Sequence, residues 1–182
     1  MIRAIGLVEF TSIARGIEAS DQMLKAANVE LLLSASTCPG KHITLVHGDV
    51  SAVENSVNTA IRLGGEFLVD HLVIPNVDEQ IFPAITGNSG VDTIHAVGVI
   101  ESFSIASMIV AADACVKAAS VDLLELRLGS GIGGKSYVIM TGDVSDVNVS
   151  VKAGVEMIKD TGNIVCYTVI PSPHADFKKT LL

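Results

Sequence analysis

The chain has 182 residues, of which 49% are hydrophobic and only 18% are charged. This composition excludes intrinsic disorder, because disordered chains combine low hydrophobicity with high charge. The formal net charge is −8, from 12 basic and 20 acidic residues, so neither nucleic acid nor an anionic membrane surface is expected as a partner. No uncharged apolar stretch reaches the roughly 18–20 residues that a bilayer-spanning helix needs.

The first elements of the chain predict a strand, a helix and a hairpin. Residues 2–9 are apolar and β-branched, which is typical of a strand. After Ser12, apolar side chains recur at the 3.6-residue spacing of a helix with one buried face, which we expect to run to Ala27. Residues 29–34 and 42–47 predict two further strands around a turn.

The next segment predicts a second helix, a last strand and a short closing helix. Ser51 and Glu54 have the spacing of a capping box, which indicates a helix start. This helix should end at Gly64, because glycine favours a helix C-terminus. Residues 66–74 predict the last strand, and residues 78–85 predict a short helix that closes the unit.

The second half of the chain repeats the first. AIGLVE at residues 4–9 recurs as AVGVIE at residues 96–101, and the later G-K, G-D-V-S and I-P motifs recur in the same order. Ordered self-similarity of this kind indicates a duplication. We therefore expect two tandem domains, residues 1–90 and residues 91–182, each with β-α-β-β-α-β order. A sheet with one helical layer defines the fold class as an α+β sandwich.

One nucleotide-binding motif is present in the second copy. Residues 129–136 read GSGIGGKS and fit the P-loop pattern G-x-x-x-x-G-K-[ST]. A P-loop requires a helix directly afterwards, because its N-terminal amides complete the anion site. Residues 137–141 read YVIMT, which predicts a strand. A P-loop NTPase is therefore the least favoured function, and a glycine-rich hairpin is the alternative interpretation.

The three cysteines occupy different sequence environments. Cys115 and Cys166 lie in apolar stretches, which predicts packing roles in the core. Cys38 lies in a turn, next to Pro39 and Gly40. An odd number of cysteines argues against a disulfide scaffold, and the five histidines show no metal-ligand spacing. From the residues alone Cys38 is interpreted as an exposed or structural thiol, because a lone cysteine outside any ligand-spacing pattern does not define a site.

These motifs together resemble the bacterial microcompartment shell domain. The resemblance rests on A-[IV]-G-x-[VI]-E in the first strand, Asp and Lys late in the first helix, and then G-K, G-D-V and a final I-P. Two unpermuted copies resemble the tandem-domain shell proteins. Residues 37–41, 131–135 and 142–148 resemble those of the PduT type, from propanediol-utilising organelles.

The resemblance implies a fold, a location and partners. It implies two microcompartment domains related to the ferredoxin-like fold, and a structural role without catalysis. It places the chain in the shell of a cytoplasmic organelle, as a homotrimer of pseudohexagonal outline that packs edge to edge with other shell proteins. Lys25 and Lys117 would lie at the tile edge. The family's terminal P-R-P-H motif lacks its arginine here, since residues 171–174 read PSPH.

The resemblance also implies a pore and a cofactor. The residues that it places around the pore are Thr37, Cys38, Pro39, Gly40, Gly131, Ile132, Gly133 and Gly134. Three copies of Cys38 on one axis would bind an iron–sulfur cluster, with [4Fe-4S] expected and one cluster per trimer. The implied functions are electron transfer across the shell to enclosed redox enzymes, sensing, or plugging of the pore. The alternative is a pore that conducts metabolites and holds no cluster.

Overall fold

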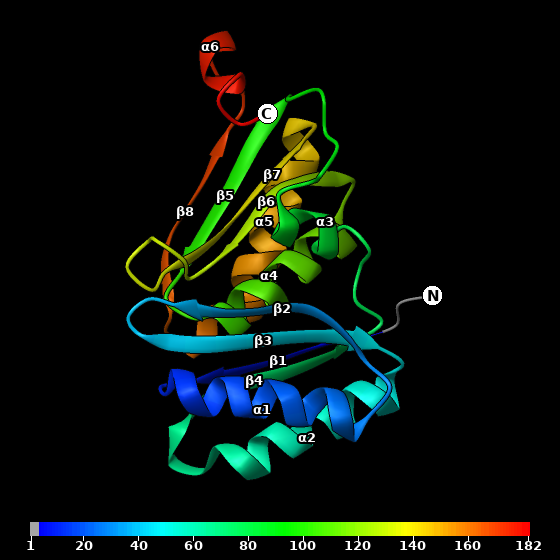
Figure 1. Ribbon diagram of the computed structural model, residues 1–182. Helices are drawn as coiled ribbons and strands as arrows, with labels where there is room; N and C mark the ends of the chain where they lie inside the picture. Colours follow the sequence, from blue (N-terminus) through cyan, green and yellow to red (C-terminus); the bar gives the residue numbers. More distant parts are fainter. Residues whose placement is uncertain (1–3) are drawn as a thin grey trace. The chain divides into compact units, whose positions relative to one another are not determined.

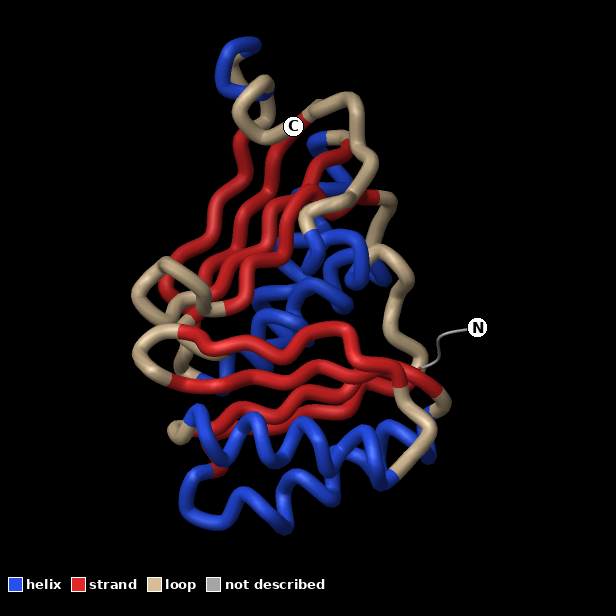
Figure 2. The backbone as a smooth tube through the Cα atoms, viewed as in Figure 1, coloured by secondary structure: helices blue, strands red, loops and turns tan. Residues whose placement is uncertain are grey.

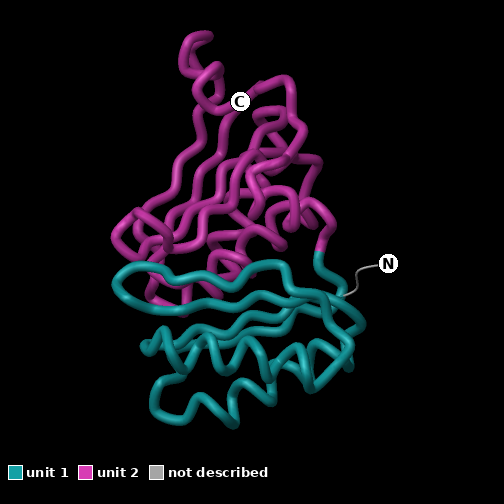
Figure 3. The backbone as a smooth tube through the Cα atoms, viewed as in Figure 1, with its two compact units in different colours: residues 1–77 teal, residues 78–182 magenta. Residues whose placement is uncertain are grey.

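Two copies of a four-stranded antiparallel sheet with two helices on one face form the computed structural model, which describes residues 4–182 (Figures 1 and 2). The chain divides into two compact units, Met1–Val77 and Asp78–Leu182 (Figure 3). Both copies have the β-α-β-β-α-β order, so the predicted α+β fold and its duplication are confirmed. Within the described range, no helix is long and apolar enough to cross a membrane.

The first unit is built around strand β1. Its elements are β1 (Ala4–Phe10), α1 (Ile13–Ala26), β2 (Glu30–Thr37), β3 (Lys41–Gly48), α2 (Val50–Gly64), the 3-10 turn η1 (Gly65–Phe67) and β4 (Leu68–Pro75). The strand order is β2-β3-β1-β4. Every β1 residue is buried, as expected for a central strand, and residues 2–3 of the predicted strand lie outside the described residues.

The second unit repeats this arrangement. Its elements are α3 (Ile81–Thr86), β5 (Ala96–Ser102), α4 (Ile105–Ala118), β6 (Val121–Leu128), β7 (Ser136–Gly142), α5 (Val144–Ile158), η2 (Lys159–Thr161), β8 (Ile164–Ile170) and α6 (Ala175–Lys178). The strand order is β6-β7-β5-β8. The register is also repeated, because Val97 pairs with Ile170 as Ile5 pairs with Ile74.

Each helix begins at a definite residue. Ser12 caps α1 by accepting a hydrogen bond from the Arg15 amide at 3.3 Å, and Ser104 caps α4 in the same way. The predicted capping box at Ser51 is wrong. The N-cap of α2 is Asp49, whose carbonyl accepts from the Val53 amide at 3.0 Å, so that Ser51 already lies inside the first turn.

Glycine in the central strand allows the second helix of each unit to pack closely. A Cβ atom on Gly6 would lie 2.6 Å from Val57 Cγ2 and 2.7 Å from Val53 Cγ1, both on α2. Gly98 has the same relationship with two valines of α5. The third position of the repeated A-[IV]-G motif therefore sets the spacing between sheet and helix.

The short helix α3 packs differently from the sequence prediction. The sequence predicts that residues 78–85 close the first copy and that the domain boundary follows residue 90. In the structure, α3 belongs to the second unit and lies along β6 (Figure 1). The Gln80 amide group makes two hydrogen bonds to the β6 backbone, which hold the segment there.

Candidate functional site

Cys38 lies in the turn that joins β2 to β3. The thiol is half-buried, and the peptide bond between Cys38 and Pro39 is cis. Gly40 has a φ of +82°, in the left-handed region that glycine adopts without strain. Its amide donates to the Thr37 carbonyl at 3.0 Å, which closes the turn. The sequence therefore places one reachable thiol at the tip of a two-stranded ribbon.

The corresponding loop of the second unit joins β6 to β7 and carries glycines instead of a thiol. Gly131, Gly133 and Gly134 all have positive φ. Strand β7 begins directly after Lys135, so this loop lacks the helix that a P-loop requires. The structure thus supports the hairpin interpretation of the GSGIGGKS segment.

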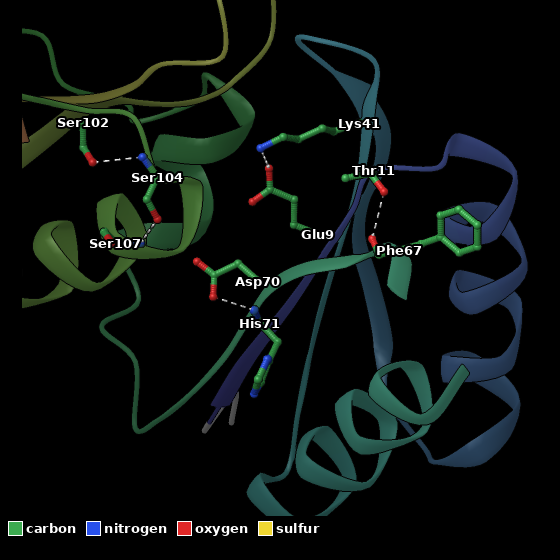
Figure 4. A network of polar contacts seen from close by, with 9 residues as sticks. All are labelled: Glu9, Thr11, Lys41, Phe67, Asp70, His71, Ser102, Ser104 and Ser107. Atoms are coloured by element: carbon green, nitrogen blue, oxygen red, sulfur yellow. Dashed lines mark hydrogen bonds and ion pairs between the residues drawn. The ribbon is translucent and has the colours of Figure 1, made fainter. Parts of the chain in front are cut away.

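A Glu–Lys ion pair joins two of the repeated motifs in each unit. Lys41 Nζ lies 2.8 Å from Glu9 Oε1, which connects the G-K motif to the end of β1 (Figure 4). Lys135 makes the equivalent pair with Glu101. The Glu9 side chain is only 4% exposed. In both copies the lysine that follows the turn therefore forms an ion pair with a glutamate of the same sheet.

The other two cysteines differ from each other. Cys115 on α4 is fully buried, and burial raises the pKa of its thiol to about 12. Its predicted core role is confirmed. Cys166 on β8 is exposed, so the predicted core role is wrong for this residue. The physical reason is that β8 is an edge strand, and its apolar sequence faces an open pocket.

That pocket was not anticipated from the sequence. It has a volume of about 360 Å³ on the sheet of the second unit, and Tyr137, Ile139 and Tyr167 lie along it. The Tyr137 hydroxyl donates to Glu125 Oε2 at 2.8 Å, and burial, followed by this bond, raises the pKa of Tyr137. A signal was available, because the chain has only two tyrosines and both fall on apolar strands.

The predicted tile-edge lysines end the first helix of each unit. Lys25 Nζ lies 2.5 Å from Asp21 Oδ2, and Lys117 Nζ lies 2.5 Å from Asp113 Oδ2. The pair on α1 is more exposed than the pair on α4. Asp113 additionally accepts from the backbone amide of Asp78 at 2.9 Å. The two lysines are therefore structural equivalents in different surroundings.

The donor set of one chain does not fit an iron–sulfur cluster. Such clusters require three or four thiolates. Within residues 4–182, no group of three or more His, Cys, Asp or Glu side chains could hold a metal ion. Cys38 offers one thiol, Cys166 is a second and distinct exposed thiol, and Cys115 is buried in the core. Several chains that bring their Cys38 turns together would meet the requirement.

The same helix face has opposite exposure in the two units. On α1, Ile13, Ile17 and Leu24 are exposed, with Ile17 at 56%. The residue equivalent to Ile17 on α4 is Ile109, which is 0% exposed. An exposed apolar stripe on one copy and a buried stripe on the other indicate that α1 has a partner outside the chain.

The sheet face shows the reverse pattern. In the first unit, Leu7 and Leu45 are fully buried. Their equivalents in the second unit, Val99 and Ile139, are only half-buried and line the open pocket. One unit therefore exposes a helix face and the other exposes a sheet face.

The family model for the BMC domain matches this chain twice, at residues 4–77 and 96–173. The two matches coincide with the two copies of the fold, and the chain belongs to the BMC domain family. Over nearly its whole length it is similar to the bacterial microcompartment shell protein PduT of Citrobacter freundii. The two are 48% identical over 174 residues, 96% of this chain and 95% of PduT.

Two further relatives support this assignment. The crystal structure of a microcompartment protein from Desulfitobacterium hafniense DCB has a TM-score of 0.93 and 50% identity, and the match covers 98% of this chain and 99% of that one. The shell protein PduA of Citrobacter freundii is 38% identical over 88 residues, which are 48% of this chain but 91% of PduA. One copy of the duplicated unit thus corresponds to almost a complete PduA chain.

Proposed function

We propose that this chain is a structural shell protein of a bacterial microcompartment, and that three chains close into a ring of six domains. The proposal accounts for the location and the non-catalytic role that the resemblance implies. In such a ring, the apolar surfaces that each chain leaves exposed would be buried against the neighbouring chains. The shell relatives PduT and PduA support the structural role.

The observation that carries the proposal is the complementary exposure of the two units. The chain exposes the α1 stripe of Ile13, Ile17 and Leu24 at one unit, and the pocket face around Tyr137 and Tyr167 at the other. A helix stripe on one chain and a sheet face on the next make a head-to-tail contact. A head-to-tail contact closes into a ring when its rotation permits. The pseudohexagonal outline that the resemblance implies has six domain positions, which three chains of two domains would fill.

The ring is tested by charge insertion on α1. Light scattering should give three times the chain mass of 19.0 kDa for the unaltered protein. Ile17→Asp should dissociate the ring at micromolar concentration, because a carboxylate would enter an apolar interface. Leu63→Asp is the matched control, since Leu63 and its equivalent Met157 are exposed in both units. An unaltered protein that is monomeric, or a trimeric Ile17→Asp, would contradict the proposal.

Within this ring, we propose that Cys38 of each chain holds a single iron–sulfur cluster. Support comes from the reachable thiol in the β2–β3 turn and from its replacement by glycines in the second unit. Each chain would then contribute one thiolate, and three would reach the minimum donor set. A bound cluster would supply one-electron chemistry, and electron transfer across the shell is the function that we propose for it.

The cofactor is tested by chemical analysis of protein purified without oxygen. We expect iron and acid-labile sulfide equivalent to one cluster per three chains, lost in Cys38→Ser and retained in Cys166→Ser. Retention of iron in Cys38→Ser would show that the site is elsewhere. A trimer without iron or sulfide would favour the metabolite pore, lined by the Cys38 turn and by residues 131–134.

A further inference from the structure

The segment that follows the last strand is repeated in both copies and folds in the same local way. Asp78 Oδ1 accepts from the Gln80 amide at 3.0 Å, and His174 Nδ1 accepts from the Asp176 amide at 3.2 Å. A short helix follows each turn, α3 in one case and α6 in the other. We call these segments the first tail (residues 78–86) and the second tail (residues 174–182).

The first tail is docked on the second unit. Gln80 Nε2 donates to the Val121 carbonyl at 3.1 Å, and Gln80 Oε1 accepts from the Leu123 amide at 3.0 Å. These two bonds satisfy edge groups of β6, which would otherwise be open to another strand. The Asp78 amide donates to Asp113 on α4. The tail of copy one therefore covers the strand edge of copy two.

The second tail is covered only in part: Leu181 near its end packs against the core around Ile94, Val97 and Leu124 of its own unit, whereas the helix α6 is not covered as α3 is. Ile81 of the first tail is 0% exposed, whereas its counterpart Phe177 in the second tail is 43% exposed. Figure 1 shows α6 projecting beyond the end of β8. A large aromatic side chain on a projecting segment indicates a contact that a single chain does not make.

The strand that would receive the second tail is β2. Leu31 pairs with Val46 of β3 as Leu123 pairs with Met140 of β7, so β2 is the structural equivalent of β6. Leu31 is 45% exposed, while Leu123, beside the docked first tail, is 2% exposed. Thus β2 presents an uncovered apolar edge at the position where β6 is covered.

The charges on the two sides are complementary. The second tail carries Lys178, and also Lys179, which pairs with Asp176 of the same tail. The β2 side carries Glu30, whose side chain is exposed, and Asp21, which pairs with Lys25 on α1. Asp176 replaces Gln80, and its carboxylate can accept from the Leu31 amide but cannot donate to the Val29 carbonyl. The contact between chains should therefore be weaker than the contact within the chain.

We propose that the second tail of one chain docks on the β2 edge of a second copy of this chain, with Phe177 covering Leu31. This inference rests on the proposed ring and specifies how neighbouring chains are joined. The in-chain contact between the first tail and β6 is the template for it. The partner is a second copy, because this chain supplies both the tail and the equivalent of the edge on which the first tail docks.

The experiment measures hydrogen–deuterium exchange and mass on the full chain. Leu63→Asp should leave β2 exchange unchanged, because Leu63 lies on α2 and its equivalent Met157 is exposed as well. Phe177→Asp should accelerate amide exchange in residues 29–33 by about tenfold or more, because the covering segment is released. Leu31→Asp, on the receiving side, should accelerate exchange of the second tail. Exchange in residues 121–125 should stay unchanged in all three variants, which verifies that each is folded.

The outcomes separate this inference from the proposed ring. A trimeric protein whose β2 exchange is the same in Phe177→Asp and in the unaltered chain would overturn the tail contact and leave the ring intact. A monomeric unaltered protein would overturn the ring, and the tail contact with it. Faster β2 exchange in Phe177→Asp alone, with trimer present in the unaltered protein, would support both.

Discussion

Lys41 Nζ lies 2.8 Å from Glu9 Oε1, and this ion pair connects the residue after the Cys38 turn to the end of the central strand. The equivalent residues Lys135 and Glu101 form the same pair beside the glycine loop. The pair survives although the two loops have diverged in sequence. It therefore fixes the base of each loop to its sheet and leaves the tip free to vary.

The Glu9–Lys41 pair should matter more to stability than its counterpart. Glu9→Gln leaves the Lys41 ammonium facing a neutral group in a largely buried site, which should cost about 1–3 kcal/mol. Glu101→Gln is the matched control, because the Glu101 and Lys135 side chains are both more than a quarter exposed, and it should cost less than about 1 kcal/mol. Urea unfolding measures both, and equal losses would contradict the assigned burial.

The close approach of α2 to β1 predicts a steric effect at Gly6. Gly6→Ala would place its Cβ within 2.7 Å of two valine methyl groups, so it should lower the free energy of unfolding by about 1–3 kcal/mol. Val57→Ala in the same chain should recover part of that loss, since it removes one of the clashing methyls. Additive losses in the double variant would show that the two positions are not coupled.

Cys115 should make stability fall at alkaline pH. Burial raises the pKa of its thiol from 9.0 to about 12, so the unfolded chain releases this proton first. The contribution of the protonated Cys115 thiol to the free energy of unfolding is complete below pH 9. It is lost as the pH rises toward 12, by at most about 1.4 kcal/mol per pH unit. Urea unfolding between about pH 8 and pH 11 should show this slope. Cys115→Ala should show a shallower slope, and identical slopes would refute the attribution.

Lys25 should control assembly of tiles without affecting the ring. Lys25 lies in the last turn of α1, and its side chain is 66% exposed. It forms an ion pair with Asp21, one turn earlier on the same helix. Lys25→Ala should abolish extended sheets in electron micrographs while light scattering still shows the trimer. Lys152→Ala, an exposed lysine on α5, is the control and should leave the sheets intact. Sheets formed equally by Lys25→Ala would remove this residue from the tile edge.

The duplication and the fold could be predicted because they depend on local patterns. Apolar alternation and helical spacing identify each element, and the helix predicted to follow Ser12 does begin there, with the Arg15 amide donating to the Ser12 side chain. The start of α2 was misplaced because Asp49 and Ser51 are both acceptable caps. What distinguishes them is the backbone hydrogen bond that the Val53 amide donates to the Asp49 carbonyl.

The features that sequence reasoning missed depend on contacts between distant residues. The position of α3 depends on the hydrogen bonds of the Gln80 side chain to the Val121 carbonyl and the Leu123 amide, and no local sequence pattern predicts them. The apolar sequence of its strand predicts Cys166 in the core, but β8 is an edge strand and its apolar residues line an open pocket. The Cys38 turn was located correctly, whereas its cluster stays a prediction, because one chain holds only part of the donor set.

The difference between the Cys38 turn and the glycine loop has a consequence for how new chemistry can arise in such a ring. A ring of six identical chains must repeat any altered loop six times around its axis. A duplicated chain repeats it three times, and the alternate positions stay free to keep small, inert loops. Threefold repetition matches a ligand set of three thiolates, so gene duplication gives this scaffold a stoichiometry that an undivided sixfold ring does not offer.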